Sequence, residues 1–385
     1  MNLHFGVCGI GFGHASRSAA LLKTLRERGY SLSVSSYGDG LTYLRRAGFD
    51  VKPVPPVGYG VLPEGKVSIK MTIFRNMLLP IRIAEQTAYE MSYIDEVEAE
   101  AVVSDTRGST VLAAKLLGKP VLTLLNQFNI RIVYPRYRRI IEAAEGVAYT
   151  VSWLWSKSNR LLIADYPPPL TLSSQNLNLP KKLENTVRFI GPIIEKKPEE
   201  LPSKEELEEK YGVPDNKPIV FFHASGPSYE RRILVKKFLK LLPRLAERFR
   251  VLATLGGVEA EANPLPEGVR VWRWVEHPLE LFKLADVVVC RAGQTTLAKA
   301  LSYGKPVIMI PIEAHAEQMG NAQSVERQGA GIIIREEELS GERLLEALER
   351  IFADEGFRRS AEHYRMVFER LNPLEEAARE VEALK

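Results

Sequence analysis

Two polar side chains in the first half of the chain follow short apolar segments and could move a proton. His14 ends the glycine cluster Gly9-Ile10-Gly11-Phe12-Gly13 and opens a segment of helical periodicity. Because the imidazole pKa lies near neutrality, a histidine at such a turn is suited to deprotonate a substrate hydroxyl; its plainer role is to cap the helix. Asp105 ends the run Ala101 to Ser104, where it would orient His14, act as the base itself or cap the next helix.

Loops of small residues in both halves suit an anionic ligand. A helix that begins after glycine offers free N–H groups and the positive end of its dipole. The first half contributes Gly11 and Gly13. In the second half the candidates for this contact are Ser225, Gly226, Arg291, Gly293, Gln294, Thr295 and Thr296, followed by Lys299, and then by His315, Glu317, Gln318 and Asn321 after the next apolar run. The first cluster does not fit a dinucleotide fingerprint, because its third glycine position is His14, which disfavours an NAD-dependent oxidoreductase.

The elements that must position these residues alternate between short apolar runs and amphipathic stretches, as in doubly wound parallel sheets. Strands are predicted near 3–8, 31–36, 101–104, 121–125, 219–222, 250–254, 287–290, 307–310 and 331–334. The fold class is therefore α/β, with two Rossmann-like domains facing a cleft. The predicted boundaries are 1–190 for a first domain, 191–202 for a linker, 203–354 for a second domain, and 355–385 for a terminal helix that packs back toward the first domain.

Composition excludes several classes of protein. Of 385 residues, 45% are hydrophobic and 26% charged, which excludes a disordered or collagen-like chain. Two cysteines cannot build a disulfide framework, and no apolar run reaches the length of a membrane span, so a cytoplasmic protein is expected. Residues 1–190 hold 23 basic and 15 acidic side chains, whereas the remainder holds 29 and 33. The basic first half could attract a phosphorylated ligand or an anionic membrane.

Two segments of the first half suggest contact with a membrane surface. Residues 69–80 are apolar with scattered cations. Residues 131–160 interleave the basic side chains Arg136, Arg138, Arg139, Lys157 and Arg160 with the aromatic side chains Tyr134, Tyr137, Tyr149, Trp153 and Trp155. Cations and aromatic rings in this mixture suit the surface of an anionic bilayer, so a peripheral location on its inner face is expected. Ordinary helices with a wet basic face would show the same pattern, and no nucleic-acid motif accompanies it.

The second half carries a specific set of motifs. The run from Cys290 through Ala330 contains C-R-A-G-Q-T-T-L, G-K-P-V-I-M-I-P, E-Q-M-G-N-A and E-R-Q-G-A-G. It resembles the donor-binding region of GT-B glycosyltransferases, above all the bacterial peptidoglycan N-acetylglucosaminyltransferases that act on a lipid-linked acceptor, and next the UDP-glucuronosyltransferase-like enzymes. Gly9 to Arg17 is similar to the first glycine loop of that family, and Ile190-Gly191-Pro192 to its linker.

The resemblance implies an inverting transfer of a sugar from a nucleotide-diphosphate donor, a UDP-sugar first, to an acceptor hydroxyl. It implies that 203–354 is the nucleotide-sugar-binding domain and 1–190 the acceptor-binding domain. It implies that His14 is the catalytic histidine, that Gln318 and Asn321 contact the donor sugar, that Gly293 to Thr296 bind the diphosphate, and that Val275 meets the base. The sequence has no Asp-x-Asp pair, so helix N-termini with Arg291 or Lys299 would stabilise the leaving group without a metal or another cofactor.

One position departs from the family pattern. Six residues after Gly293, where the family commonly has a ribose-binding glutamate, this chain has Lys299. An ammonium group donates hydrogen bonds and accepts none. Lys299 could contact a phosphate, or its presence could indicate a different donor. Alternatively, Glu276 could bind the ribose in its place, or Lys299 could simply point to solvent. The rival functions are a nucleotide-sugar 2-epimerase, which needs no acceptor, and a non-catalytic nucleotide-sugar-binding subunit.

Overall fold

The computed structural model describes residues 1–385 except 58–77, 129–137, 184–185, 214–216, 260–264, 313–314 and 385. Side chains are described for these residues apart from 138–144, 147–148, 182 and 228–229. The chain divides into two compact units, which are considered separately. The first contains Met1–Glu195 and Asn372–Lys385, and the second contains Lys196–Leu371.

The first unit is built on a seven-stranded parallel sheet in the order β3-β2-β1-β4-β5-β6-β7. Its strands are β1 (Asn2–Val7), β2 (Ser31–Ser36), β3 (Val51–Pro53), β4 (Ala101–Asp105), β5 (Val121–Leu125), β6 (Arg160–Ile163) and β7 (Val187–Phe189). The strand order reverses between β1 and β4, where Val7 pairs with Asp105. Such a reversal is where doubly wound sheets bind ligands, because the connections on either side run to opposite faces and leave the carboxyl ends open.

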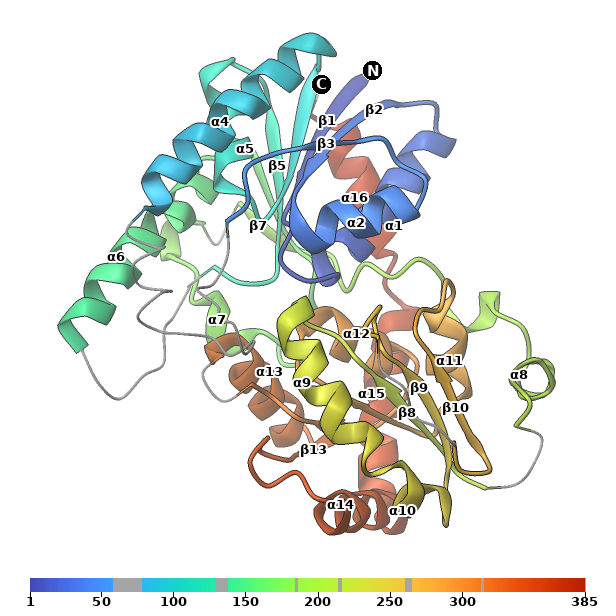
Figure 1. Ribbon diagram of the computed structural model, residues 1–385. Coiled ribbons are helices and arrows are strands. Elements are labelled where there is room, and N and C mark those ends of the chain that lie inside the picture. Colours follow the sequence, from blue (N-terminus) through green and yellow to red (C-terminus); the bar gives the residue numbers. More distant parts are fainter. Residues whose placement is uncertain are drawn as a thin grey trace. The chain divides into compact units, whose positions relative to one another are not determined.

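Helices cover both faces of this sheet (Figure 1). They are α1 (Gly13–Glu27), α2 (Gly38–Arg46), α4 (Leu79–Glu96), α5 (Gly108–Leu116), α6 (Arg138–Trp155), α7 (Ser174–Leu177) and α16 (Pro373–Glu382). Alternation along β4 supplies both cores, because successive side chains of a strand point to opposite faces. Ala101 and Val103 pack in the cluster that includes α1 and α16, and Val102 packs in the cluster that includes α4, α5 and α6.

The second unit has a six-stranded parallel sheet in the order β10-β9-β8-β11-β12-β13. Its strands are β8 (Ile219–His223), β9 (Arg250–Thr254), β10 (Val269–Trp272), β11 (Val287–Cys290), β12 (Val307–Met309) and β13 (Gly331–Ile333). The order reverses between β8 and β11, where His223 pairs with Cys290. The helices are α8 (Lys204–Tyr211), α9 (Ser228–Leu239), α10 (Leu242–Ala246), α11 (Pro278–Leu284), α12 (Gln294–Ser302), α13 (Ala316–Arg327), α14 (Gly341–Ala353) and α15 (Glu355–Glu369).

The predicted α/β class with two parallel sheets is confirmed. Sequence periodicity missed the strands β3, β6, β7 and β10, which are short and each include a charged side chain that shortens or interrupts the apolar run: Lys52, Arg160, Arg188 and Arg270. The equally short strands β11, β12 and β13 contain no charged residue and were predicted. The unit boundary lies between Glu195 and Lys196, inside the segment 191–202. The segment 355–385 is divided: α15 belongs to the second unit and α16 to the first. Within the described residues, none of the helices combines the length and the hydropathy that crossing a bilayer requires.

Candidate functional site

The first candidate site lies at the strand reversal of the first unit. Gly11 has a left-handed backbone (φ 67°), which lets the chain turn sharply out of β1 into α1. His14 therefore sits in the first turn of α1, and Asp105 ends the adjacent strand β4. His14 Nδ1 lies 2.8 Å from Asp105 Oδ1. The two residues proposed from the sequence for proton transfer are thus in direct contact.

Asp105 is fully buried and surrounded by donors that the sequence had not singled out. Arg17 donates from Nε to Oδ2 at 2.8 Å and from Nη2 to Oδ1, and Ser18 Oγ donates to Oδ2 at 2.8 Å. Thr106 Oγ1 adds a bond to Oδ1 at 3.1 Å. Burial raises the pKa of Asp105, but the charges of Arg17 and His14 and their hydrogen bonds outweigh it, so the pKa lies well below its usual range.

The contact between Asp105 and Nδ1 determines which nitrogen of His14 can act as a base. A carboxylate that accepts from Nδ1–H keeps that proton in place and leaves the lone pair on Nε2. The His14 side chain is 16% exposed, and Nε2 makes no hydrogen bond to any residue that the structure describes. The arrangement can therefore accept a proton at Nε2 and stabilise the resulting imidazolium with a buried negative charge.

Sequence reasoning could have found Arg17 and Ser18 from helical spacing. They stand three and four residues after His14, so all three side chains share one face of α1. Thr106 could not have been found in this way. It adopts a left-handed backbone (φ 59°), an uncommon conformation for a β-branched residue, directly after Asp105. Its hydroxyl bonds the carbonyl of Leu124, which ties the turn to β5.

The second candidate site lies at the strand reversal of the second unit. Ser225 and Gly226 follow β8, and Arg291 and Gly293 follow β11. Gly293 caps α12 with ordinary dihedral angles, and a Cβ atom added there would meet nothing within 4 Å. Ser225 Oγ is buried and has no hydrogen-bond partner among the described residues. Open space before a helix N-terminus, beside an unsatisfied hydroxyl, suits an anionic group.

Lys299, one turn into α12, contributes positive charge to the end of β8. Burial lowers the pKa of His223, and the charges of Lys299 and Arg231 lower it further, to about 3. His223 is therefore neutral at physiological pH, and its Nδ1 lies 2.9 Å from Thr254 Oγ1. The charge of Lys299 therefore reaches the carboxyl end of β8, two residues before Ser225. Sequence reasoning had not singled out His223.

The remaining candidate residues of the second unit form hydrogen bonds that stabilise the loops at the carboxyl edge of its sheet. Arg291 is buried, donates to the carbonyl of Ile310 at 3.0 Å and pairs with Glu336 at 2.6 Å. Its charge is thus engaged inside the unit. His315 caps α13 by accepting from the backbone N–H of Gln318 at 3.4 Å, and burial lowers its pKa.

The two amides proposed as donor contacts also bond the backbone. Gln318 Oε1 accepts from the backbone N–H of Ile312 at 3.1 Å, and Asn321 Nδ2 donates to the carbonyl of Ala292 at 3.1 Å. Asn321 Oδ1 is buried without a hydrogen-bond partner among the described residues. Of the other candidates, Thr296 is buried in the first turn of α12, while Thr295, Glu317 and Val275 are half-buried. Gln294 is also buried in that turn.

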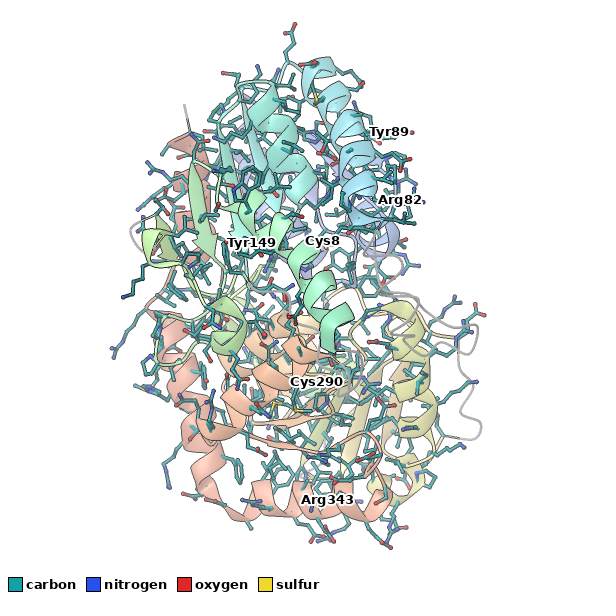
Figure 2. The ribbon with its side chains drawn as sticks, turned by 90° about the vertical axis from the view of Figure 1, so that its left-hand side faces the viewer. Cys8, Arg82, Tyr89, Tyr149, Cys290 and Arg343 are labelled. Carbon is teal, nitrogen blue, oxygen red and sulfur yellow. The ribbon has the colours of Figure 1, made fainter. Side chains whose placement is uncertain are left out.

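The aromatic and basic segments of the first half are described only in part. Residues 69–77 and 129–137 and the side chains of Arg138 and Arg139 lie outside the described residues. Trp155 is 1% exposed and belongs to the core, as an ordinary helix would have it. Tyr149 and Trp153, in contrast, are 58% and 48% exposed, and Lys157 Nζ lies 4.8 Å from the centre of the Trp153 ring. Figure 2 shows Tyr149 on α6 and Tyr89 with Arg82 on α4.

Comparisons with known protein families give one match in each half of the chain. Residues 1–177 match the family Glycosyl transferase family 1, and residues 224–374 match the Glycosyltransferase family 28 C-terminal domain. An uncharacterized glycosyltransferase of Methanosarcina acetivorans is 26% identical over 365 residues, which cover 94% of this chain and 93% of that protein.

Two further similarities concern about a third of the chain and the fold. The UDP-N-acetylglucosamine--N-acetylmuramyl-(pentapeptide) pyrophosphoryl-undecaprenol N-acetylglucosamine transferase of Geobacter metallireducens is 33% identical over 144 residues, 35% of this chain and 39% of that protein. The crystal structure of the calicheamicin glycosyltransferase CalG4 superposes with a TM-score of 0.71 at 16% identity, covering 99% and 98% of the two chains. That likeness concerns the fold alone. The chain is a glycosyltransferase with the GT-B fold that resembles the peptidoglycan N-acetylglucosaminyltransferases.

Proposed function

We propose that the protein is a metal-independent, inverting glycosyltransferase that moves a sugar from a UDP-sugar to a hydroxyl of a lipid-linked acceptor. The observation that carries the proposal is the contact between His14 Nδ1 and the buried Asp105 carboxylate. In the proposed reaction His14 Nε2 removes the proton of the acceptor hydroxyl. The acceptor oxygen then bonds to the anomeric carbon from the face opposite the donor phosphate. The bond from that carbon to the phosphate oxygen breaks, its electron pair leaves with the nucleoside diphosphate, and the configuration inverts.

The leaving group develops negative charge that fixed positive groups must stabilise. The N-terminus of α12 beyond Gly293, the hydroxyl of Ser225 and the charge of Lys299 supply such groups at one edge of the second sheet. An ammonium here supports the view that Lys299 meets a phosphate rather than a ribose, because it can only donate hydrogen bonds. The name of the Geobacter relative specifies a UDP-sugar donor and a pyrophosphoryl-undecaprenol acceptor, and it supports both parts of the proposal.

The experiment compares turnover with UDP affinity in His14→Ala. Without its base the enzyme should lose turnover by about 10²- to 10⁴-fold, whereas the dissociation constant of UDP, measured by calorimetry, should stay within about two-fold. Asp105→Asn should behave similarly, because an amide no longer fixes the Nδ1 proton. His363→Ala, an exposed histidine on α15, is the matched control. Equal loss of turnover and affinity would refute the assignment, and product formed without an acceptor would favour a 2-epimerase.

The lipid-linked acceptor has a separate test. Tyr149 and Trp153 are four residues apart, on one face of α6, and both are exposed. Aromatic rings beside a cation favour the interface of a bilayer, so the wild-type protein should float with vesicles of anionic phospholipid at low salt. The pair of changes Tyr149→Ser and Trp153→Ser should reduce flotation several-fold. Met366→Ser, an exposed apolar residue of α15, should not. Absence of wild-type flotation at low salt would contradict membrane docking.

A further inference from the structure

A groove of about 960 Å³ opens at the amino-terminal edge of the second sheet. Ile219 at the start of β8, Val287 at the start of β11 and Pro306 just before β12 line it, together with residues of α8 and α15. The candidate donor residues follow the carboxyl ends of the same strands. Since β8 spans five residues at about 3.3 Å each, the two edges are about 13 Å apart. The groove is therefore separate from the proposed active site.

The acidic side chains of this groove already have basic partners. Asp286 accepts from the backbone N–H of Ile219 at 2.8 Å and lies 3.7 Å from Lys204 Nζ. Glu362 accepts from Arg365 Nε at 2.9 Å. The two other acids of the lining are paired as well: Glu208 lies 3.8 Å from Lys204 Nζ, and Glu355 lies 3.6 Å from Arg359 Nη1. These pairs account for the negative charge of the groove.

Three cations of the lining remain after this pairing: Lys217, Lys305 and Arg358. None of the three has an acidic side chain within 4.0 Å among the described residues. Burial is the main cause that lowers the pKa of Lys305 to about 8; the charges of Lys204 and Arg358 act in the same direction, and those of Asp286 and Glu362 oppose the shift. Desolvation and repulsion between cations destabilise the charged lysine, and attraction to a bound anion would offset both effects.

We propose that this groove binds a small anion that carries a di- or triphosphate group, with Lys305 and Arg358 as its charged contacts. More than one unpaired cation in a single groove favours a ligand with more than one negative charge. The volume is within the range of small-molecule sites, and Ile219, Ile351 and Phe352 give the groove an apolar wall. The group could belong to a nucleotide or to inorganic polyphosphate, and the two sources are distinguished below.

The test measures acetylation of individual lysines by peptide mass spectrometry at constant ionic strength and pH 8. Inorganic pyrophosphate should slow acetylation of Lys305 at least five-fold. It should leave Lys240, an exposed lysine after α9, unchanged in the same digest. ADP is tested in parallel: protection at lower concentration than pyrophosphate identifies a nucleotide, and equal protection identifies the phosphate group as sufficient. If neither compound protects Lys305 more than Lys240, the proposal is wrong.

Two variants separate this groove from the proposed active site. Arg358→Gln changes an exposed residue and should reduce the protection of Lys305 several-fold without loss of folding. Ser225→Ala, at the opposite edge of the sheet, should retain the protection in full. If Ser225→Ala abolishes protection and Arg358→Gln does not, the anion acts from the carboxyl edge, and the groove is not its site.

Discussion

At the scale of single residues, the first candidate site is a buried negative charge that is balanced by neighbouring hydrogen-bond donors. One buried carboxylate, Asp105, receives hydrogen bonds from His14, Arg17, Ser18 and Thr106. Arg17 compensates the charge, so the carboxylate stays ionised at any pH where the enzyme would work. The left-handed Thr106 costs about 1–2 kcal/mol of backbone strain. This conformation lets the Thr106 hydroxyl form hydrogen bonds with the Asp105 carboxylate and the Leu124 carbonyl.

A second buried charge cluster lies in the same unit, between α4 and the sheet. Glu90 is fully buried; its carboxylate lies 2.9 Å from both His4 Nε2 and Arg107 Nη2. Ser35 Oγ donates to it at 2.6 Å and Thr110 Oγ1 at 3.1 Å. These partners come from β1, β2 and α5 and from the residue before α5, so one carboxylate joins several elements. Like the site around Asp105, this cluster is a buried carboxylate surrounded by donors, but its role is structural.

Glu90→Gln tests this cluster through the pH dependence of stability. Burial raises the pKa of Glu90, but Arg107 and His4 bring it down to about 2, from an ordinary value of 4.5. A lowered pKa stabilises the folded state above pH 4.5, and that stability is lost as the pH falls from 4.5 toward 2. Glu90→Gln should remove this part of the acid dependence. It should also lower the free energy of unfolding at pH 7 by about 3–5 kcal/mol, because Arg107 loses its partner.

The measurement is urea unfolding between pH 2 and pH 7. Glu85→Gln is the control, since Glu85 forms an exposed pair with Arg82 on the same helix, and its loss should change stability by about 1 kcal/mol or less. If Glu90→Gln unfolds with the same acid dependence as the wild-type protein, Glu90 does not carry the stabilising charge.

At the scale of elements, both units place their candidate residues at a strand reversal. In the first unit the turn between β1 and α1 is tightly packed: a Cβ atom at Gly9 would lie 1.9 Å from the carbonyl oxygen of Tyr37. In the second unit the turn between β11 and α12 is open, because a Cβ atom at Gly293 would meet nothing within 4 Å. Close packing therefore requires glycine at position 9, whereas Gly293 borders space for a ligand.

Paired glycine substitutions separate these reasons. Gly9→Ala should destabilise the protein by about 1–3 kcal/mol or more, because backbone must move to admit the methyl group. Gly293→Ala should change the free energy of unfolding by about 0.5 kcal/mol or less, yet raise the dissociation constant of UDP several-fold by crowding the start of α12. Thermal unfolding and calorimetry measure the two effects. Unchanged UDP binding in a folded Gly293→Ala protein would place the diphosphate elsewhere.

At the scale of the whole molecule, the end of the chain belongs to the first unit. Helix α16 buries Ala377, Ala378 and Val381 in the core cluster that includes α1 (Figure 1). Ion pairs surround this contact: Arg28 with Glu382 at 3.0 Å and with Glu375, and Arg188 with Glu380 at 2.7 Å. The first unit is thus completed by residues that follow the second unit in the sequence.

Ala378→Asp tests this arrangement by placing a charge in the contact between α16 and α1. A buried, unpaired carboxylate should destabilise the first unit by several kcal/mol, on the order of 3 or more. Hydrogen exchange should therefore speed up in β1 and α1 and stay unchanged in β8 and α12. Glu380→Gln, at the edge of the same helix, should have little effect, because exposed ion pairs contribute little. Equal acceleration in both units would show that they unfold together.

The sequence by itself determined the α/β class, the main strands and helices, and the residues at the strand ends. Apolar periodicity and glycine turns are local signals, so His14, Asp105, Ser225 and Gly293 could be identified as candidates from their places after apolar runs. The family resemblance also rested on a continuous run, residues 290–330. The short strands β3, β6, β7 and β10 were missed because a charged residue in each breaks an already short apolar pattern.

Only the tertiary structure decided which of these residues meet. Asp105 and His14 are 91 positions apart, and the parallel pairing of β1 with β4 brings them together. In the second unit, the pairing of β8 with β11 likewise lets the charge of Lys299, on α12, act on the pKa of His223. The tertiary structure also determines which side chains are buried: Trp155 lies in the core, whereas Trp153 is exposed. Contacts and burial depend on sheet order and on packing from distant segments, which no local pattern encodes.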